Sequence, residues 1–157
     1  MKNRALFSLA AVGLSLVTGC GAIAQGGGTK GGPPGPGVKC NNGANNNCVI
    51  EVSVPANSCS SDEIKLEEVV QLDPASKFVE WRLSTGYVFC QKDGDGAFLK
   101  PDSPGKDGFK PVGNPNCTGS FTWMRQKNDG LAYRYGLVFR SVDKSKSCTK
   151  DPWIRNG

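Results

Sequence analysis

Cysteine is the residue type with most chemical potential in this chain, since the 157 residues include seven cysteines and no histidine. Without histidine, the Ser-His-Asp and Cys-His catalytic sets are excluded, and so is the His₂Cys ligand set of a blue-copper site. No Cys-x-x-Cys pair occurs, so the spacing of a structural zinc site is also missing. The sequence therefore predicts no metal site, no cofactor and no catalytic residues, and the chain is expected not to be an enzyme.

Six of the cysteines are dispersed over the larger, C-terminal part of the chain: Cys40, Cys48, Cys59, Cys90, Cys117 and Cys148. An even number of dispersed cysteines in an exported domain predicts three disulfides. Only the Cys40–Cys48 pairing has a local argument, because the two residues bracket the flexible sequence NNGANNN. Chain entropy for so short a loop corresponds to about 2.6 kcal/mol. The remaining pairings are left open by the sequence.

Carboxylates offer the other possible chemistry. Glu67, Glu68 and Glu80 could supply the acid pair of a glycoside hydrolase, although nothing in the sequence marks them as buried or paired. The sequence DGDG at residues 93–96 suggests calcium, but an EF-hand loop needs an oxygen ligand and then a glycine where this chain has Ala97 and Phe98. We therefore expect a turn at residues 93–96 and keep a carboxylate-based hydrolase as an alternative.

Three arginines form a possible binding surface. Arg134 and Arg140 alternate with the apolar residues of one predicted strand, and Arg125 could join them across a hairpin. Such a surface would attract an anionic glycan, a lipid headgroup or an acidic protein, whereas the alternative is an ordinary solvated sheet face. The net charge of +5, which falls to about +3 without Lys2 and Arg4, is too low to predict nucleic-acid binding.

Period-two alternation predicts the strands that position these residues. Buried faces are expected at Ile50, Val52 and Val54, at Val79, Trp81 and Leu83, and at Tyr87 and Phe89. The clearest unit is a hairpin in which residues 120–126 and 131–142 flank a turn at residues 128–130. Its second strand should place one apolar row in the core: Tyr133, Tyr135, Leu137 and Phe139.

Two segments are less regular. Residues 60–73 could begin a helix at the capping-box pair Ser60 and Glu63, but the β-branched residues favour two strand pieces with a bulge at Glu67–Glu68. Residues 91–119 are expected to be a long irregular surface loop that Cys117 holds down. Together the pattern predicts an all-β fold, an antiparallel, immunoglobulin-like β-sandwich of about seven strands stabilised by disulfides.

The N-terminal residues have the composition of an export signal. Lys2 and Arg4 precede the apolar run 5–17, whose helical length of about 20 Å is shorter than a bilayer core. The Gly- and Pro-rich residues 25–39 are expected to form a flexible spacer. The predicted organisation is a signal peptide at 1–19, a modified N-terminus with linker at 20–39, and a domain at 40–157.

The sequence Val17-Thr18-Gly19-Cys20 resembles the lipobox of bacterial lipoprotein precursors. This resemblance implies that Cys20 becomes the first residue and carries acyl chains such as palmitate, so that the chain is bound to a membrane. Gly21 is not the aspartate that retains lipoproteins at the inner membrane of enteric bacteria, which favours the outer membrane in a Gram-negative host. The alternative is ordinary cleavage after the Ala22–Ala24 motif, which would release a periplasmic or secreted protein.

The C-terminal sequence also loosely resembles the ends of small β-sandwich domains in uncharacterised bacterial secreted proteins, which implies no function. We therefore expect a lipid-anchored envelope protein that binds an envelope protein or glycan, with a structural assembly role as an alternative. Its best binding anchors would be any of the three tryptophans that lie exposed: Trp81, Trp123 and Trp153.

Overall fold

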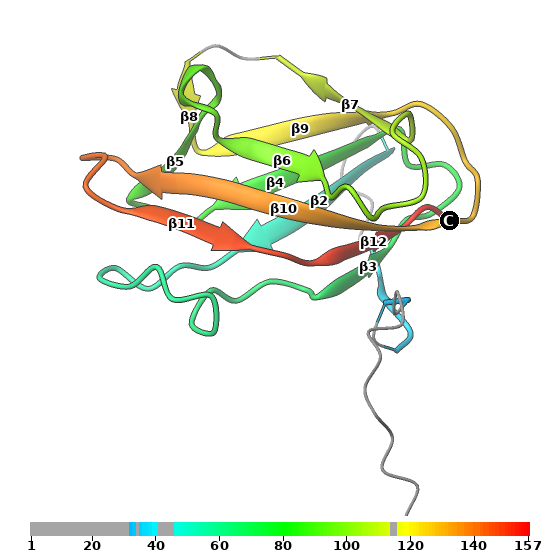
Figure 1. Cartoon of the computed structure of the whole chain (residues 1–157), viewed down its shortest axis with the longest axis horizontal. Helices are drawn as coiled ribbons and strands as arrows, with labels where there is room; N and C mark the ends of the chain where they lie inside the picture. The colour runs from blue at the N-terminus through cyan, green and yellow to red at the C-terminus, as the bar shows by residue number, and fades with distance from the viewer. Residues whose placement is uncertain (1–31, 34, 41–45, 114–115) are drawn as a thin grey trace, which may run out of the picture.

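The structure is a computed structural model that describes residues 32–33, 35–40, 46–113 and 116–157 (Figure 1). This part of the chain forms twelve β-strands and a short 3₁₀ turn, η2 (Gln91–Asp93), and contains no α-helix. None of its helical segments is long and apolar enough to cross a membrane. The predicted all-β class is therefore confirmed for the described residues.

The larger sheet is built around one long strand, β10 (Ala132–Ser141). Leu137 of β10 lies opposite both Lys150 of one neighbour and Ala97 of another, so strands are bonded to both of its edges. One edge holds β12 and β11 and the other holds β6 and β5 (Figure 1). The partners, with the strands beyond them, are β12 (Trp153–Arg155), β11 (Ser147–Lys150), β6 (Gly96–Leu99), β5 (Tyr87–Cys90), β3 (Val69–Gln71), β1 (Val38–Lys39) and β8 (Cys117–Thr118).

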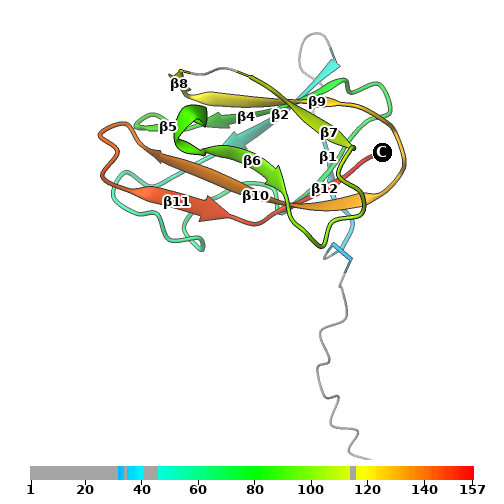
Figure 2. The same ribbon diagram turned by 45° about the horizontal axis from the view of Figure 1, so that its top comes forward.

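The smaller sheet has four strands in the order β2 (Asn47–Val52), β4 (Phe78–Leu83), β9 (Ser120–Arg125) and β7 (Phe109–Val112). The two sheets pack face to face, as the 45° turn between Figures 1 and 2 makes visible. β1 belongs to the larger sheet through its pairing with β3, so the sheet begins inside the segment that the sequence assigned to the linker.

Both sheets are mixed, which corrects the prediction of a purely antiparallel arrangement. Three of the ten strand pairs are parallel: β1 with β3, β3 with β12, and β2 with β4. The chain leaves β2, contributes β3 to the opposite sheet and returns as β4, so β4 runs beside β2 in the same direction. Antiparallel neighbours need only a tight turn, whereas parallel neighbours need such a crossover.

The predicted hairpin at residues 120–142 is wrong, although the positive φ expected in its connection is found. Gly130 has the expected positive φ of 67°, but β9 pairs with β4 and β7 while β10 belongs to the other sheet. The turn therefore connects the two sheets. Trp123 of β9 and Tyr135 of β10 face each other through their rings, with centroids 5.7 Å apart. Both strands bury an aromatic face, and this arrangement lets each face cover the other.

Nine aromatic rings form a continuous network between the sheets. At its centre, Trp81 of β4 packs edge-on against Trp123 at 4.9 Å and donates its indole N–H to the hydroxyl of Tyr135, 3.0 Å away. Trp81 and Tyr135 are completely buried, and the burial raises the pKa of Tyr135 above its ordinary value. The predicted core rows are buried as expected, apart from the partly exposed Leu83.

The two irregular segments differ from their predictions in detail. In residues 60–73 only β3 forms a ladder strand, and Ser60 accepts the amides of Glu63 and Ile64 in a single turn instead of starting a helix. Residues 91–119 are not an irregular loop, because they include β6, β7 and β8. Their strands escaped detection because β6 has only four residues and begins with glycine, while β7 contains Pro111.

The six domain cysteines form the three expected disulfides. Cys40 is joined to Cys48, as the local argument predicted, and the open pairings are Cys59–Cys148 and Cys90–Cys117. The first bond ties the end of β1 to β2 and so links the two sheets. The second attaches the loop before β3 to β11, and the third joins directly opposed residues of β5 and β8. Cys20 lies outside the described residues, so its lipidation stays a prediction.

The Trp81–Tyr135 hydrogen bond gives a test of the core. Replacing Tyr135 with Phe leaves the indole N–H buried without an acceptor, so the free energy of unfolding should fall by about 1–3 kcal/mol. Urea unfolding followed by tryptophan fluorescence would measure it. Trp81→Phe and the double variant complete a cycle, and the two losses should not add. A stability unchanged in Tyr135→Phe would contradict the role of this bond.

Candidate functional site

Arg140, one of the predicted binding residues, is occupied by an internal carboxylate. Its guanidinium forms two hydrogen bonds of 2.6 Å to the two carboxylate oxygens of Asp95, whose side chain is fully buried. These bonds raise the pKa of Arg140 above its ordinary value. Asp95 also accepts the amide of the buried Cys90 at 3.0 Å. The pair therefore fixes the turn between β5 and β6, which is the role predicted for residues 93–96.

Arg134 lies on the same face of β10, but six residues away, a distance of roughly 20 Å along a strand. It is half-exposed and lies 3.6 Å from Asp102 and from Asp151. Asp151 also pairs with Lys100 at 2.7 Å. The positive charge of Arg134 is thus shared with two surface carboxylates of its own chain.

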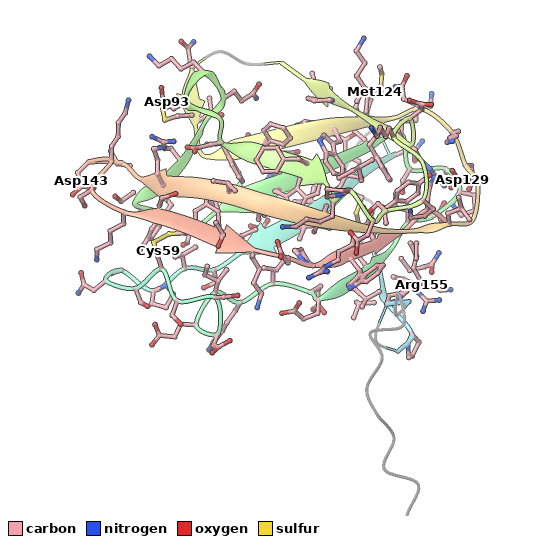
Figure 3. All side chains as sticks on the ribbon, in the orientation of Figure 1. Cys59, Asp93, Met124, Asp129, Asp143 and Arg155 are labelled. Carbon is pink, nitrogen blue, oxygen red and sulfur yellow. A yellow bond between two sulfur atoms is a disulfide. The ribbon has the colours of Figure 1, made fainter. Side chains whose placement is uncertain are left out.

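Arg125 belongs to a third cluster, which also contains Asp129. In Figure 3, Asp129 lies at the opposite end of the molecule from Asp93, which pairs with Arg140. Burial lowers the pKa of Arg125, while the charges of Asp129 and Asp73 act in the opposite direction. The guanidinium donates to side-chain oxygens and main-chain carbonyls on several segments: Asn128, Asn156, Asp73, Pro74, Ser76 and Lys127. The three arginines are therefore not brought together, and a shared binding role for them stays a prediction.

Asp129 connects this cluster to the core. Its carboxylate accepts hydrogen bonds from the hydroxyl of Tyr133, the side-chain amide of Asn156 and the backbone amide of Leu131. Burial alone would raise the pKa of Asp129, but these hydrogen bonds outweigh it and the pKa lies below its ordinary value. Asn156 is fully buried, so the cluster attaches the end of β12 to the turn between the sheets.

Of the predicted glutamates, Glu67 and Glu68 are exposed and Glu80 is partly buried. Glu80 accepts two hydrogen bonds from Arg82, at 2.8 and 3.2 Å, Glu68 pairs with Lys150 at 2.7 Å, and Glu67 is exposed. Among the described residues, Cys90, Asp93 and Cys117 hold potential metal-ligand atoms within 4.8 Å of one another. Both cysteines of this group are consumed by a disulfide, so it is not a metal-binding set.

The tryptophans contribute less exposed surface than a binding role would require. Trp81 and Trp123 are core residues with 0% and 2% of their surface exposed, and only Trp153 is half-buried. Two of the three predicted anchors are therefore unavailable as exposed platforms. An accessible aromatic surface exists elsewhere, at Phe98 of β6, which is 44% exposed.

Phe98 belongs to a cleft of about 710 Å³ between β6 of the larger sheet and β7 of the smaller one. The floor is apolar, and Trp123 and Phe109, stacked with centroids 5.1 Å apart, form part of it. The segment connecting β6 to β7 contributes Pro101, Ser103 and Gly105. An apolar cleft with a few polar groups at its margin is the usual form of a binding site.

The charged side chains that line this cleft are Lys100 and Lys106, and both are positive. Lys110 follows on β7 as an exposed residue. Lys100 is paired with Asp151, whereas no described acidic side chain lies within ion-pair distance of Lys106. The cleft therefore combines an apolar floor with a basic rim.

The cleft lies on the flank opposite to the point where the chain enters the domain. A second, smaller cleft of about 440 Å³ is lined by β1 and β2, which are edge strands of the two sheets. β7 is the other edge of the smaller sheet, and β6 lies across β10 from β12, β3 and β1. The N-terminal segment thus reaches the domain along one flank, and the β6–β7 cleft opens on the other.

No family model, curated protein or solved structure matches this chain. The sequence analysis missed the cleft because residues 91–119 were assigned to an irregular loop. The sequence did contain one signal of the cleft. Phe98 is a large apolar residue just before a stretch rich in proline and lysine, and no predicted strand would have buried it.

The Asp95–Arg140 pair predicts a structural phenotype. Asp95→Ala leaves the buried amide of Cys90 without an acceptor and should lower the free energy of unfolding by about 1–3 kcal/mol. Asp95→Asn retains a side-chain acceptor and should lose less, as measured by urea unfolding. Asp102→Ala, which removes only an exposed partner of Arg134, is the control and should change stability by less than about 1 kcal/mol. Equal losses in Asp95→Ala and Asp102→Ala would refute a structural role for Arg140.

Asp129 predicts an acid-sensitive contribution to stability. Because its folded pKa is depressed, this contribution is fully present above the unfolded pKa of about 3.9 and disappears as the pH falls through the folded pKa. Asp129→Asn should therefore be less stable than the parent at neutral pH, and the difference should shrink below about pH 4. Urea unfolding at a series of pH values measures it, with Asp102→Asn as the control. A difference independent of pH would contradict the assignment.

Proposed function

We propose that this chain is a lipid-anchored protein of the cell envelope that binds a partner in the β6–β7 cleft. The observation that carries the proposal is the apolar, lysine-rimmed cleft on the flank opposite to β1. A partner can therefore reach the cleft without meeting the point where the chain enters the domain. The lipobox resemblance at residues 17–20 supplies the anchor, with Cys20 as the acylated residue and residues 20–39 as the linker.

Two further features support the proposal. Disulfides persist in oxidising compartments outside the cytoplasm, and this domain has three of them. The two sheets packed through an aromatic core support an immunoglobulin-like sandwich, which we retain as the proposed fold type. Such domains commonly bind through surfaces that a rigid scaffold supports. An outer-membrane location in a Gram-negative host is part of the same proposal, and release after Ala24 is its alternative.

Site-specific photo-crosslinking in the host tests the cleft as a binding surface. The full chain would carry a photoreactive phenylalanine analogue at Phe98, inside the cleft, or at Val142, which is 61% exposed at the β10–β11 turn. We expect a discrete crosslinked product from position 98 and none from position 142. Lys106→Glu in the position-98 protein should reduce the product. Equal products from both positions, or a product from position 142 only, would contradict the proposal.

A further inference from the structure

β2 is an edge strand of the smaller sheet. Its inner edge faces β4, and at the end of this edge the carbonyl of Val52 accepts the amide of Ser84 at 2.9 Å. The next residue, Ser53, points in the other direction and exchanges two hydrogen bonds of 2.9 Å with Lys65. Main-chain groups alternate in direction along a strand, so the even-numbered residues of β2 bond to β4 and the odd-numbered residues face outward.

The outward-facing residues of β2 are accessible. They are Asn47, Val49 and Glu51, of which the first two are half-buried and Glu51 is exposed, whereas the buried residues of β2 are those that bond to β4. Val49 and Glu51 also line the smaller cleft of about 440 Å³, so open space lies beside this edge. In the described part of the chain, no residue forms a hydrogen bond with the main-chain groups of these three residues.

The two edge strands of the smaller sheet are protected to different degrees. β7 contains Pro111, which has no N–H to offer another strand, whereas β2 contains no proline, glycine or lysine. Soluble proteins usually place such residues on an exposed edge, because an unprotected edge pairs with further strands. The lack of protection on β2 favours a strand partner at this edge.

The three free residues fit a second copy of the same strand. Two copies related by a two-fold axis place β2 antiparallel to β2. If Val49 lies opposite Val49 of the second copy, Asn47 lies opposite Glu51 at both ends, and each opposed pair exchanges two main-chain hydrogen bonds. A shift of the register by two residues in either direction would leave one free residue of each copy unpaired. The self-opposed Val49 register is therefore the one that uses the whole edge.

The side chains are compatible with this register. Two valines meet at the two-fold axis, and on either side the amide of Asn47 faces the carboxylate of Glu51, to which it can donate. The two Glu51 carboxylates are separated by roughly 14 Å along the strands, so like charges do not face each other. Asn46 has a positive φ of 58°, which ends the extended conformation just before β2. The strand of the second copy therefore ends before it would meet Lys65.

We propose that two copies of this chain form a dimer by antiparallel pairing of β2 with β2, which joins their four-stranded sheets into one continuous sheet. β7 is the far edge of the same sheet, so the β6–β7 cleft stays open in both copies. The inference concerns the opposite flank of the domain and does not depend on the proposed function.

Co-purification of two differently tagged copies of the full chain, extracted from host cells in mild detergent, tests the dimer. We expect the parent copies to co-purify. Val49→Lys places two like charges opposite each other at the two-fold axis, so co-purification of two Val49→Lys copies should fall several-fold. A Val49→Lys copy paired with a Val49→Glu copy should recover it, because the opposed charges then attract. This recovery also shows that both variants fold.

Met124→Lys is the matched control for the added charge. Met124 is exposed on the outer face of the same sheet, but it belongs to β9, which is bonded on both edges. Two Met124→Lys copies should co-purify like the parent. Parent copies that do not co-purify, Val49→Lys copies that do, or a mixed Lys and Glu pair that does not recover would each overturn the dimer. Crosslinking at Phe98 tests the β6–β7 cleft separately.

Discussion

The burial of the aromatic face of β10 against the smaller sheet is the constraint on which the structure depends. Tyr133, Tyr135 and Phe139 are completely buried, and Tyr135 meets Trp81 across the interface through both ring contact and a hydrogen bond. Because β10 bonds neighbours along both edges, its orientation fixes the larger sheet as a whole. The rings fill the centre of the domain. One flank is joined by the Cys40–Cys48 disulfide, and the other contains the β6–β7 cleft.

The predicted binding arginines mainly form hydrogen bonds and ion pairs with other groups of the same chain. Arg140 fixes the turn before β6 through Asp95, and Arg125 joins the turn between the sheets to Asn156. Those guanidinium groups donate to the buried side chains of Asp95 and Asn156, and burying such polar groups without partners is costly. The lysines beside the cleft differ, because Lys106 has no carboxylate among the described residues within ion-pair distance. In the proposed binding surface the basic residues are therefore lysines, and not the three arginines that the sequence indicated.

The sequence predicted strand faces well and strand partners poorly, and the physical reason is the same for both. Alternation reports which side chains are buried, so the row from Tyr133 to Phe139 was correct. The alternation does not indicate which strand lies beside which, or whether two neighbouring strands run parallel or antiparallel. The parallel β2–β4 pair and the placement of β9 and β10 in different sheets could therefore not be deduced. The partner of Arg140 is Asp95, 45 residues away, a relation set by the fold alone. The cleft was missed because its strands are short and contain Gly96 and Pro111.

We propose that a disulfide-bonded domain is held at a membrane by a lipid on Cys20 and has its cleft on the flank opposite to β1. The intact mass of the mature chain from host membranes, with and without the lipoprotein-peptidase inhibitor globomycin, tests it most directly. We expect a chain that begins at Cys20, carries acyl mass and holds its six other cysteines oxidised, and that retains its signal peptide when the inhibitor is present. A soluble, unacylated chain that begins at Gln25 would contradict the claim.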